Sequence, residues 1–475
     1  MDNGARVCTT TRMLRAAHAA LGALLLLVGG PLPVSALPPG FAVEVVVGAA
    51  AFPSAFAFAP DGSRLYYTER FTGQIRVYDV AAGALLPAPF ATVPAFTDGA
   101  DERGLLGIAV DPGFPSEPFV YVFHHVAPDA ARITRFTDIG NLGTAPTAIW
   151  DAIPAARIHN GGYIGFGPDG KLYVTVGETG VASHAQNPGV VPGKLHRINR
   201  DGTVPPDNPF PGSSIWSLGL RNSFGFSFHP VTGSLFLSEP GPTTNDEINR
   251  IVEGQNYGWP TQLGCTGDPA SDPLLVFPRV TTPNGSVIFA SNRYPAEYLH
   301  TLLFGEWNTG RIQRSVLLGS PDTAALAATT FLELPGDNLL DLKLGPDGLL
   351  WFSTPTSIRR VRYTLPLSLP RVASHGASAI GNRLILSVLG TAGDTAFVVL
   401  TSAGTAFLRL IGLGPIGPLG VAARLVEIPP DPTLAGRTVL LRGLTIDPAG
   451  QGTLTDPVGL AIVETDPSPH CVATE

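Results

Sequence analysis

The stretch at 159–162 reads His-Asn-Gly-Gly and is the first candidate for chemistry in the chain. A histidine followed by two glycines is typical of a place where the backbone approaches another group closely, because glycine has no side chain to obstruct the approach. Glu178 follows His159 by 19 residues, at the end of a predicted strand over 172–176. A carboxylate beside an imidazole orients the ring and favours its charged form, which is the arrangement of a general base. We therefore expect His159 and Glu178 to form a catalytic pair; the alternative is a structural histidine.

Two further groups combine residues that could bind charge. Arg221 carries a fixed fork of donors suited to a developing oxyanion or a carboxylate, and Asn222 adds an amide. The alternative for Arg221 is a structural ion pair with an acidic loop. Gly241 and Pro242 precede an acidic pair at 246–247, and backbone carbonyls together with carboxylates are the hard oxygen ligands that suit Ca²⁺. The alternative there is a tight loop whose carboxylates accept hydrogen bonds from backbone N–H groups.

The elements that must position these residues repeat along the chain. Each repeat is a strand, a turn rich in Pro, Asp and Gly, and a second strand, since Pro presets φ for a turn and Gly accepts positive φ. The turn prolines fall at positions 60, 112, 168, 230, 283 and 346, a spacing of 52 to 63 residues. That period is typical of a four-stranded propeller blade with a long loop. The sequence therefore predicts an all-β fold with a six-bladed β-propeller over residues 37–365.

The ends of the predicted propeller lie far apart in the sequence. Residues 41–47 alternate apolar and polar side chains and are predicted to pair with 358–363, which would close the ring. From residue 366 to 475 the turn motif disappears and strands are predicted at 384–388, 396–400 and 439–443. We interpret this part as a small β-sandwich-like accessory domain, and we assign it no chemistry because it holds no cluster of titratable residues.

The first 36 residues are typical of a secretory signal peptide. Arg12 and Arg15 precede an apolar run over 19–29. The small residues at 34–36, which end at Ala36, are typical of a signal-peptidase cleavage site. The run is short for a membrane span, so we expect an exported protein, periplasmic or extracellular, with no membrane span after cleavage near Ala36. Cys265 and Cys471 are the cysteines that remain after the leader; they could form a disulfide or stay as two free thiols.

Charge excludes one class of partner. The formal net charge is -8, whereas a nucleic-acid surface needs clustered Lys and Arg to displace counterions. We therefore expect no nucleic-acid partner.

Ordered motifs between residues 103 and 260 support a family resemblance. They are Arg103-Gly104-Leu105-Leu106-Gly107, His159-Asn160-Gly161-Gly162, Phe166-Gly167-Pro168-Asp169-Gly170-Lys171-Leu172-Tyr173, Gly193-Lys194-Leu195, Arg197-Ile198-Asn199, Asp207-Asn208-Pro209, Gly219 with Arg221-Asn222, Gly241-Pro242, Asp246-Glu247-Ile248-Asn249 and Asn256-Tyr257-Gly258-Trp259-Pro260. In this order and spacing the chain resembles the glucose/sorbosone dehydrogenase family of soluble quinoprotein sugar dehydrogenases. The resemblance covers residues 37–363.

The resemblance implies a reaction and a set of ligands. His159 would take the proton from the anomeric hydroxyl of an aldose while hydride passes to pyrroloquinoline quinone (PQQ), and Glu178 would support His159 where the family commonly has Asp. Arg221 would stabilise the reduced quinone oxygen. The partners would be a small sugar substrate and an electron acceptor.

The resemblance also implies how the cofactors are held. Arg103, Arg221 and Asn222 would contact the quinone. The backbone carbonyls of Gly241 and Pro242 would bind calcium, which would polarise the quinone carbonyl as a Lewis acid.

Several residues that bind the quinone carboxylates in the family are missing. No lysine stands near 306–309, and the stretch 338–341 reads Asn-Leu-Leu-Asp where the family has a pair of arginines. Arg103 stands where many members have Gln. PQQ carries three carboxylates, and each lost bidentate Arg contact removes on the order of 1.5–3 kcal/mol of binding free energy. Arg103, Arg311 and Arg314 are candidates to compensate.

These observations lead to two main hypotheses. The first is an exported PQQ- and calcium-dependent aldose dehydrogenase. The alternative is a propeller without the quinone that binds a glycan or a protein partner. A calcium-dependent hydrolase is a third option, since propellers also host lactone-cleaving sites, but no residue pattern favours it.

Overall fold

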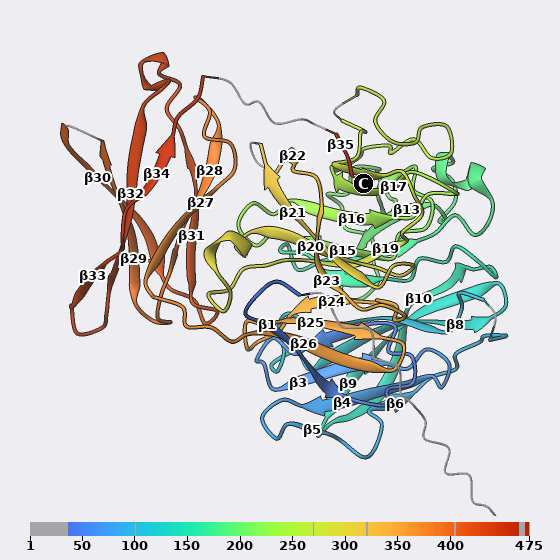
Figure 1. Cartoon of the computed structure of the whole chain (residues 1–475). Helices are drawn as coiled ribbons and strands as arrows, with labels where there is room; N and C mark the ends of the chain where they lie inside the picture. Colours follow the sequence, from blue (N-terminus) through green and yellow to red (C-terminus); the bar gives the residue numbers. More distant parts are fainter. Residues whose placement is uncertain are drawn as a thin grey trace, which may run out of the picture. The chain divides into compact units, whose positions relative to one another are not determined.

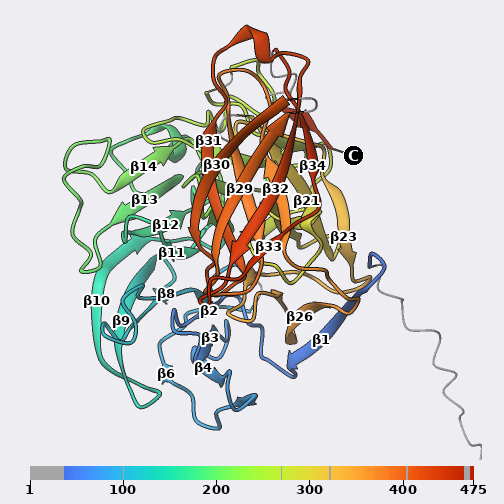
Figure 2. The same cartoon turned by 90° about the vertical axis from the view of Figure 1, so that its left-hand side faces the viewer.

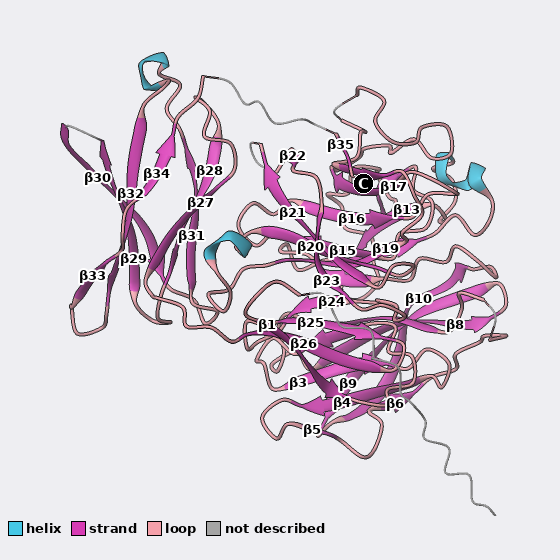
Figure 3. Ribbon diagram, viewed as in Figure 1, coloured by secondary structure: helices cyan, strands magenta, loops and turns pink. Residues whose placement is uncertain are grey.

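The computed structural model describes residues 37–99, 101–268, 270–319, 322–402, 405–464 and 471–474. The predicted signal peptide at 1–36 lies outside these residues. Strands dominate the described part of the chain, which contains three short 3₁₀ helices, η1 (Ala182–Gln186), η2 (Ala296–Tyr298) and η3 (Pro432–Leu434) (Figure 3). None of its helices has the length and apolar character needed to cross a membrane.

The first three propeller sheets are each built from consecutive strands (Figure 1). The first sheet contains β2 (Phe56–Phe58), β3 (Arg64–Thr68), β4 (Gln74–Asp79), β5 (Ala84–Leu85) and β6 (Ala91–Thr92). The second contains β7 (Leu105–Val110), β8 (Phe119–Ala127), β9 (Ala130–Ile139) and β10 (Leu142–Pro154). The third contains β11 (Ile164–Phe166), β12 (Leu172–Val176), β13 (Lys194–Ile198) and β14 (Ile215–Leu218).

Three more sheets follow, and two of them recruit a strand from an end of the chain. The fourth contains β15 (Gly225–Phe228), β16 (Leu235–Glu239), β17 (Asp246–Ile251), β18 (Leu275–Phe277) and β35 (Val472–Ala473). The fifth contains β19 (Pro283–Ile288), β20 (Thr301–Glu306), β21 (Arg311–Leu318), β22 (Ala324–Ala325) and β23 (Thr329–Glu333). The sixth contains β24 (Leu342–Leu344), β25 (Leu350–Thr354), β26 (Ser357–Tyr363) and β1 (Phe41–Val47).

The predicted closure between the chain's distant ends is confirmed. β1 pairs antiparallel with β26, with Phe41 opposite Tyr363 and Val43 opposite Val361 (Figure 2). The hydrophobic clusters follow the same circuit, because each of six clusters is shared by two successive sheets and one joins the sixth sheet to the first. Sheets that bury their faces only against their neighbours form a closed ring, which is the arrangement of a β-propeller.

Five of the six predicted turns join the first two strands of a sheet. The prediction of a turn at Pro283-Asn284-Gly285 was wrong, because these residues lie inside β19. Pro283 is tolerated there since it opens the strand, where its missing N–H breaks no ladder in mid-strand. The connection in this sheet falls later, between β19 and β20, in a longer loop that contains η2.

The region after residue 366 forms two further sheets. One contains β27 (Arg371–His375), β28 (Arg383–Leu389) and β31 (Val421–Glu427). The other contains β29 (Thr395–Ser402), β30 (Thr405–Pro415), β32 (Thr438–Ile446), β33 (Gly452–Leu454) and β34 (Val458–Ala461). Both contribute to one hydrophobic cluster, for example Leu386 from the first sheet and Val398 from the second, so the three predicted strands exist and share a core.

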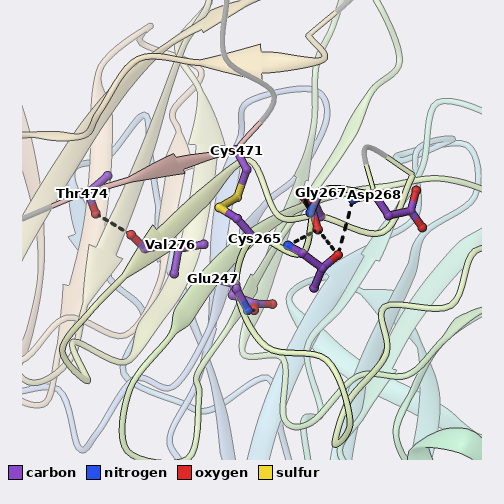
Figure 4. The surroundings of a disulfide bond; sticks show 10 residues. Glu247, Cys265, Gly267, Asp268, Val276, Cys471 and Thr474 are labelled. Atoms are coloured by element: carbon purple, nitrogen blue, oxygen red, sulfur yellow. Dashed lines mark hydrogen bonds between the residues drawn. A yellow bond between two sulfur atoms is a disulfide. The ribbon is translucent and has the colours of Figure 1, made fainter.

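The last described residues return to the propeller. β35 pairs in parallel with β18, and Thr474 N donates to Val276 O at 2.8 Å. Cys471, next to β35, forms a disulfide with Cys265, with a Cα–Cα distance of 5.9 Å across a sequence separation of 206 residues (Figure 4). The open question of two thiols or one disulfide is therefore answered in favour of the disulfide.

Candidate functional site

His159 lies in the loop between β10 and β11, where the backbone is tightly constrained. Its φ is +59°, in the left-handed region that non-glycine residues rarely adopt. Its N–H donates to Glu102 Oε2 at 2.6 Å, which holds it in that conformation. Gly161, with φ +62°, passes so close to the neighbouring strand that a Cβ would lie 2.8 Å from Thr175 O. The glycine is therefore needed for close approach, as the sequence predicted.

The structure brings the predicted pair together. His159 Nδ1 contacts Glu178 Oε1 directly. Glu178 is buried just beyond the end of β12, and its N–H donates to Arg221 O at 2.8 Å. Its Oε1 also accepts from Gly180 N at 3.1 Å. The carboxylate is therefore fixed, and it fixes the imidazole.

Arg221 faces the other ring nitrogen of His159. Its Nη2 lies 3.0 Å from His159 Nε2, its Nη1 donates to Pro240 O at 3.0 Å, and its guanidinium lies 5.5 Å from the ring centre of Trp259. A guanidinium can only donate, so Nε2 accepts and Nδ1 carries the proton toward Glu178. These contacts favour the tautomer with the Nε2 lone pair on the side of Arg221.

Two carboxylates, the buried Glu239 and the half-buried Glu102, hold these groups in place. Glu239 Oε1 accepts from Arg221 N at 2.8 Å and from Asn222 N at 2.6 Å. Burial raises the pKa of Glu239 to about 7. Glu102 Oε2 accepts from Asn222 Nδ2 at 3.1 Å as well as from His159 N. Asn222 Oδ1 in turn accepts from Gly161 N at 2.9 Å, so Asn222 ties the histidine loop to the arginine loop.

Of the two residues predicted to offer carbonyls to calcium, Gly241 belongs to the wall of a small cavity that Arg221 also lines. Gly241 lines it together with Glu239, Glu247 and Asn249, while Pro242 is exposed next to it. Gly241 N donates to Asp246 Oδ1 at 2.7 Å, so the acidic loop does satisfy backbone groups, as the alternative reading anticipated. Burial raises the pKa of Glu247. Asn249 Oδ1 is buried without a hydrogen-bond partner.

A larger cavity of about 440 Å³ opens beside the histidine loop, a size typical of small-molecule sites. All six propeller sheets contribute to its wall, through residues at or just before the start of their first strands. Its lining comprises Phe52, Ser54, Ala55, Arg70, Glu102, Leu106, Gly107, Asn160, Gly161, Gly162, Tyr163, Phe224, Thr282, Asn284, Trp307, Asn308 and Leu340. The cavity therefore lies at one end of the ring, where the first strands begin.

The candidate compensating arginines lie elsewhere. Arg103 does not line the cavity; its guanidinium pairs with Asp101 and Asp98, and its Nη1 donates to Pro128 O at 2.9 Å. Arg311 forms an ion pair with Glu333 at 3.1 Å. Arg314 Nη2 donates to the backbone of Glu297. None of the three arginines lines the cavity.

Three residues of the site escaped the sequence analysis. Glu102 and Glu239 support the backbone of the histidine and arginine loops, and Arg70 lines the cavity. Glu102 had a local signal, because it directly precedes the motif that begins at Arg103. Glu239 stands in the motif Ser238-Glu239-Pro240-Gly241-Pro242 but was given no role of its own, and Arg70 had no local signal, since it meets its partners only through the tertiary fold.

Comparison with known proteins agrees with the arrangement described above. The family model "Glucose / Sorbosone dehydrogenase" matches residues 50–361. Quinoprotein glucose dehydrogenase B of Acinetobacter calcoaceticus is 34% identical over 250 residues, which is 46% of this chain and 52% of that protein, so the alignment spans about half of that relative. The aldose sugar dehydrogenase of Escherichia coli is 27% identical over 350 residues, 68% of this chain and 92% of that protein.

A solved structure is similar to most of the chain in both sequence and fold. The PQQ-bound form of the aldose sugar dehydrogenase from Streptomyces coelicolor is 30% identical with a TM-score of 0.58, and the match covers 69% of this chain and 99% of that chain.

Proposed function

Because the chain belongs to the glucose/sorbosone dehydrogenase family, we propose that it is an exported, PQQ- and calcium-dependent sugar dehydrogenase on a six-bladed propeller. It oxidises the anomeric hydroxyl of an aldose and passes the electrons to an external acceptor. The small sandwich-like region after residue 366 is an accessory domain in this proposal.

One observation carries the proposal: the hydrogen-bond partners of His159 favour the tautomer with its proton on Nδ1. Glu178 engages Nδ1, and Arg221 donates to Nε2. This is the tautomer a general base needs, because the free lone pair accepts the proton of the substrate hydroxyl. The carboxylate of Glu178 then stabilises the imidazolium that forms.

Proton transfer requires one exchange of partners. A sugar hydroxyl must take the place of Arg221 Nη2 at His159 Nε2. Arg221 keeps its contact with Pro240 O and its position near Trp259, so its charge stays close to the reacting atoms. From there the guanidinium stabilises negative charge that develops on an oxygen nearby.

The larger cavity fits a planar ring with one anchored carboxylate. Phe52, Phe224 and Trp307 supply flat apolar surface, and Arg70 supplies a cation. The two stretches that lack the family's cofactor anchors each contribute a neutral residue to the cavity wall, Asn308 and Leu340. PQQ, when bound, would supply hydride acceptance at its quinone carbonyl, with Arg70 and Asn308 as the wall residues that would hold it. Asn222, the expected contact, does not line this cavity, and its amide is engaged by Gly161 N and Glu102. With fewer cationic contacts we expect weaker binding than three anchors would give.

The donor set of the smaller cavity fits a hard cation. In the described residues no group of three or more His, Cys, Asp or Glu side chains is placed to hold a metal, so backbone carbonyls have to contribute. The carbonyls of Gly241 and Pro242 would hold calcium together with Asn249 Oδ1, the buried oxygen without a partner. The carboxyl groups of Glu239 and Glu247 are buried in the wall of the same cavity. All of these are oxygen ligands of the kind Ca²⁺ prefers.

Reconstitution tests the activity. The purified protein is incubated with PQQ and Ca²⁺, given a panel of aldoses and a dye acceptor, and compared with His159→Ala. We expect sugar-dependent dye reduction that falls by about 10²–10⁴-fold in the variant. No turnover over a broad panel, with PQQ bound, would reject the proposal.

Export is part of the same proposal. The apolar leader motivates it, and the disulfide is typical of an oxidising compartment. N-terminal sequencing of the mature protein should find a start near Leu37; a retained leader would contradict export.

The neutral cavity wall favours a second candidate function, a propeller without the quinone that binds a glycan or a protein. Asn308 and Leu340 place no charge where a tricarboxylate needs it. Calorimetry separates the two candidates, since micromolar or tighter PQQ binding would eliminate the second.

A further inference from the structure

We infer that Arg70 is the residue with which the larger cavity binds a carboxylate, carried either by the quinone cofactor or by an acidic sugar. The inference rests on the proposed function, because it assigns a ligand group to the same cavity. The position was not among the expected cofactor contacts, which were Arg103, Arg221 and Asn222.

The Arg70 guanidinium is held in a defined orientation by the backbone. Nε donates to Arg103 O at 2.9 Å, and Nη2 donates to Asp101 O. Its Cζ lies 5.2 Å from the ring centre of Phe52 and 4.9 Å from that of Phe71. These contacts position the side chain without cancelling its charge, since carbonyls and aromatic faces carry no net charge.

Two other cations near the cavity, Arg103 and Lys343, already have carboxylate partners, whereas the guanidinium of Arg221 is engaged by His159 and Pro240 O. Arg103 pairs with Asp101, and Lys343 pairs with Asp341 at 2.8 Å beneath the cavity residue Tyr163. No ion pair joins Arg70 to a carboxylate anywhere in the described residues. Arg70 is thus the one cationic side chain on the described cavity wall, and no carboxylate lies within ion-pair distance of it, although Asp101 and Glu102 favour its charged form from farther away.

The carboxylate on the wall is engaged elsewhere. Glu102 Oε2 already accepts from His159 N and Asn222 Nδ2. Meanwhile burial lowers the pKa of Arg70, which reflects the cost of a charge in a partly desolvated place. A ligand carboxylate would offset that cost and form a charge-assisted hydrogen bond.

The wall as a whole suits a ligand with a single anchored negative charge. Beyond Arg70 and Glu102 the lining residues are neutral, and the polar ones, such as Thr282, Asn284 and Asn308, offer amides and a hydroxyl. Asn284 Oδ1 is buried without a partner and can accept from a ligand hydroxyl, whereas Nδ2 of Asn284 and of Asn308 already donates to backbone carbonyls. The guanidinium suits the carboxylate of a ligand.

Calorimetry with matched ligands tests the assignment. The probes are PQQ with its neutral trimethyl ester, and D-glucuronate with D-glucose. The proteins are the wild type, Arg70→Gln, Arg70→Lys and Arg314→Gln. Arg314 is the matched control, because it too is held by a backbone carbonyl and an aromatic face but lies outside the cavity.

We expect at least one acid to bind the wild type more tightly than its neutral counterpart. Arg70→Gln should weaken binding of that acid by roughly ten- to hundred-fold and leave the neutral counterpart unchanged. Arg70→Lys should retain part of the preference, and Arg314→Gln all of it. Which acid responds identifies the source of the carboxylate.

Two outcomes would overturn the assignment: equal binding of acid and neutral counterpart in both pairs, or undiminished acid binding by a folded Arg70→Gln. If Arg70→Gln does not fold, the same calorimetry is repeated on the wild type at increasing salt concentration. Because salt screens charge–charge attraction, it should weaken binding of the acid and leave binding of its neutral counterpart unchanged. Arg70-dependent binding without sugar oxidation would leave the assignment standing and remove the proposed activity. Sugar oxidation without any preference for an acid would support the proposed activity and overturn the assignment of Arg70.

Discussion

At the scale of single residues, the charge of Glu178 is the feature on which the orientation of His159 depends. Its carboxylate contacts Nδ1 and is buried. Replacing it by Gln keeps the shape but removes the charge that stabilises the imidazolium. We expect Glu178→Gln to lower kcat by roughly 10²-fold or more, measured by dye-linked turnover of the reconstituted protein.

The control for this change is Glu178→Asp, which keeps the charge on a shorter side chain. Glu178→Asp should retain most of the wild-type activity, whereas Glu178→Gln should not. Equal turnover of Glu178→Gln and wild type would show that the carboxylate has no role in proton transfer.

The sequence motifs were sufficient to find the residues that meet at His159, and insufficient to find what holds them. Glu178, Arg221 and Asn222 were predicted from local motifs, and all three contact the histidine loop. The role of Glu239 was missed because its partners, the N–H groups of Arg221 and Asn222 and the Ser223 hydroxyl, lie on another loop. Arg103 was overvalued because its guanidinium pairs with Asp98 and Asp101, which precede it by five and two residues in the sequence.

At the scale of elements, the closing strand depends on Phe41. Its ring lies 4.8 Å from that of Tyr363 and 4.9 Å from that of Tyr294, between the fifth and sixth sheets. Phe41→Ala should lower the free energy of unfolding by about 3 kcal/mol, since it opens a cavity in an aromatic cluster. Urea unfolding measures the change. Val45→Ala is the control, because Val45 lies on the same strand but is 58% exposed; equal losses in both would contradict the role given to Phe41.

The disulfide joins the end of the chain to a loop that borders the site. The loop at 258–265 includes Trp259 near Arg221, and Gly264 N donates to Glu247 Oε1 at 2.7 Å. Cys265→Ser or Cys471→Ser should cost about 2–5 kcal/mol of stability, measured by thermal unfolding. The double variant should lose no more than either single variant, because one bond is removed in all three. A double loss near the sum would indicate separate roles for the two thiols.

Elements were predictable where turn chemistry is local and unpredictable where partners are distant. The Pro-Asp-Gly turns located five strand pairs, because the turn residues themselves set the backbone. The misplaced turn at 283–285 matched that composition but lies in a strand, where tertiary pairing prevailed. The strand β35 and its disulfide partner are separated by 206 residues, so no local pattern indicates that they meet.

At the scale of the whole molecule, buried histidines should make the free energy of unfolding fall as the pH falls. His124 and His196 lie in the second and third sheets, and His375 lies in β27. Burial lowers the pKa of each to about 4, whereas an unfolded histidine has a pKa near 6.5. Between these values the unfolded chain binds protons that the folded chain does not, so stability falls as pH falls from about 6.5 to about 4.

His196 offers the sharpest test of this dependence, because it is fully buried and its two ring nitrogens already have neutral partners, Ser214 Oγ and Val191 O, at 2.9 Å each. His196→Gln cannot take up a proton in the unfolded state. The variant should lose stability at pH 7 through weaker packing, yet lose less on acidification, by up to about 3 kcal/mol. Because the packing cost is present at both pH values, the difference between unfolding free energies at pH 7 and pH 4.5 isolates the protonation effect. Identical differences for variant and wild type would show that His196 does not contribute, and that acid acts on the propeller through other groups.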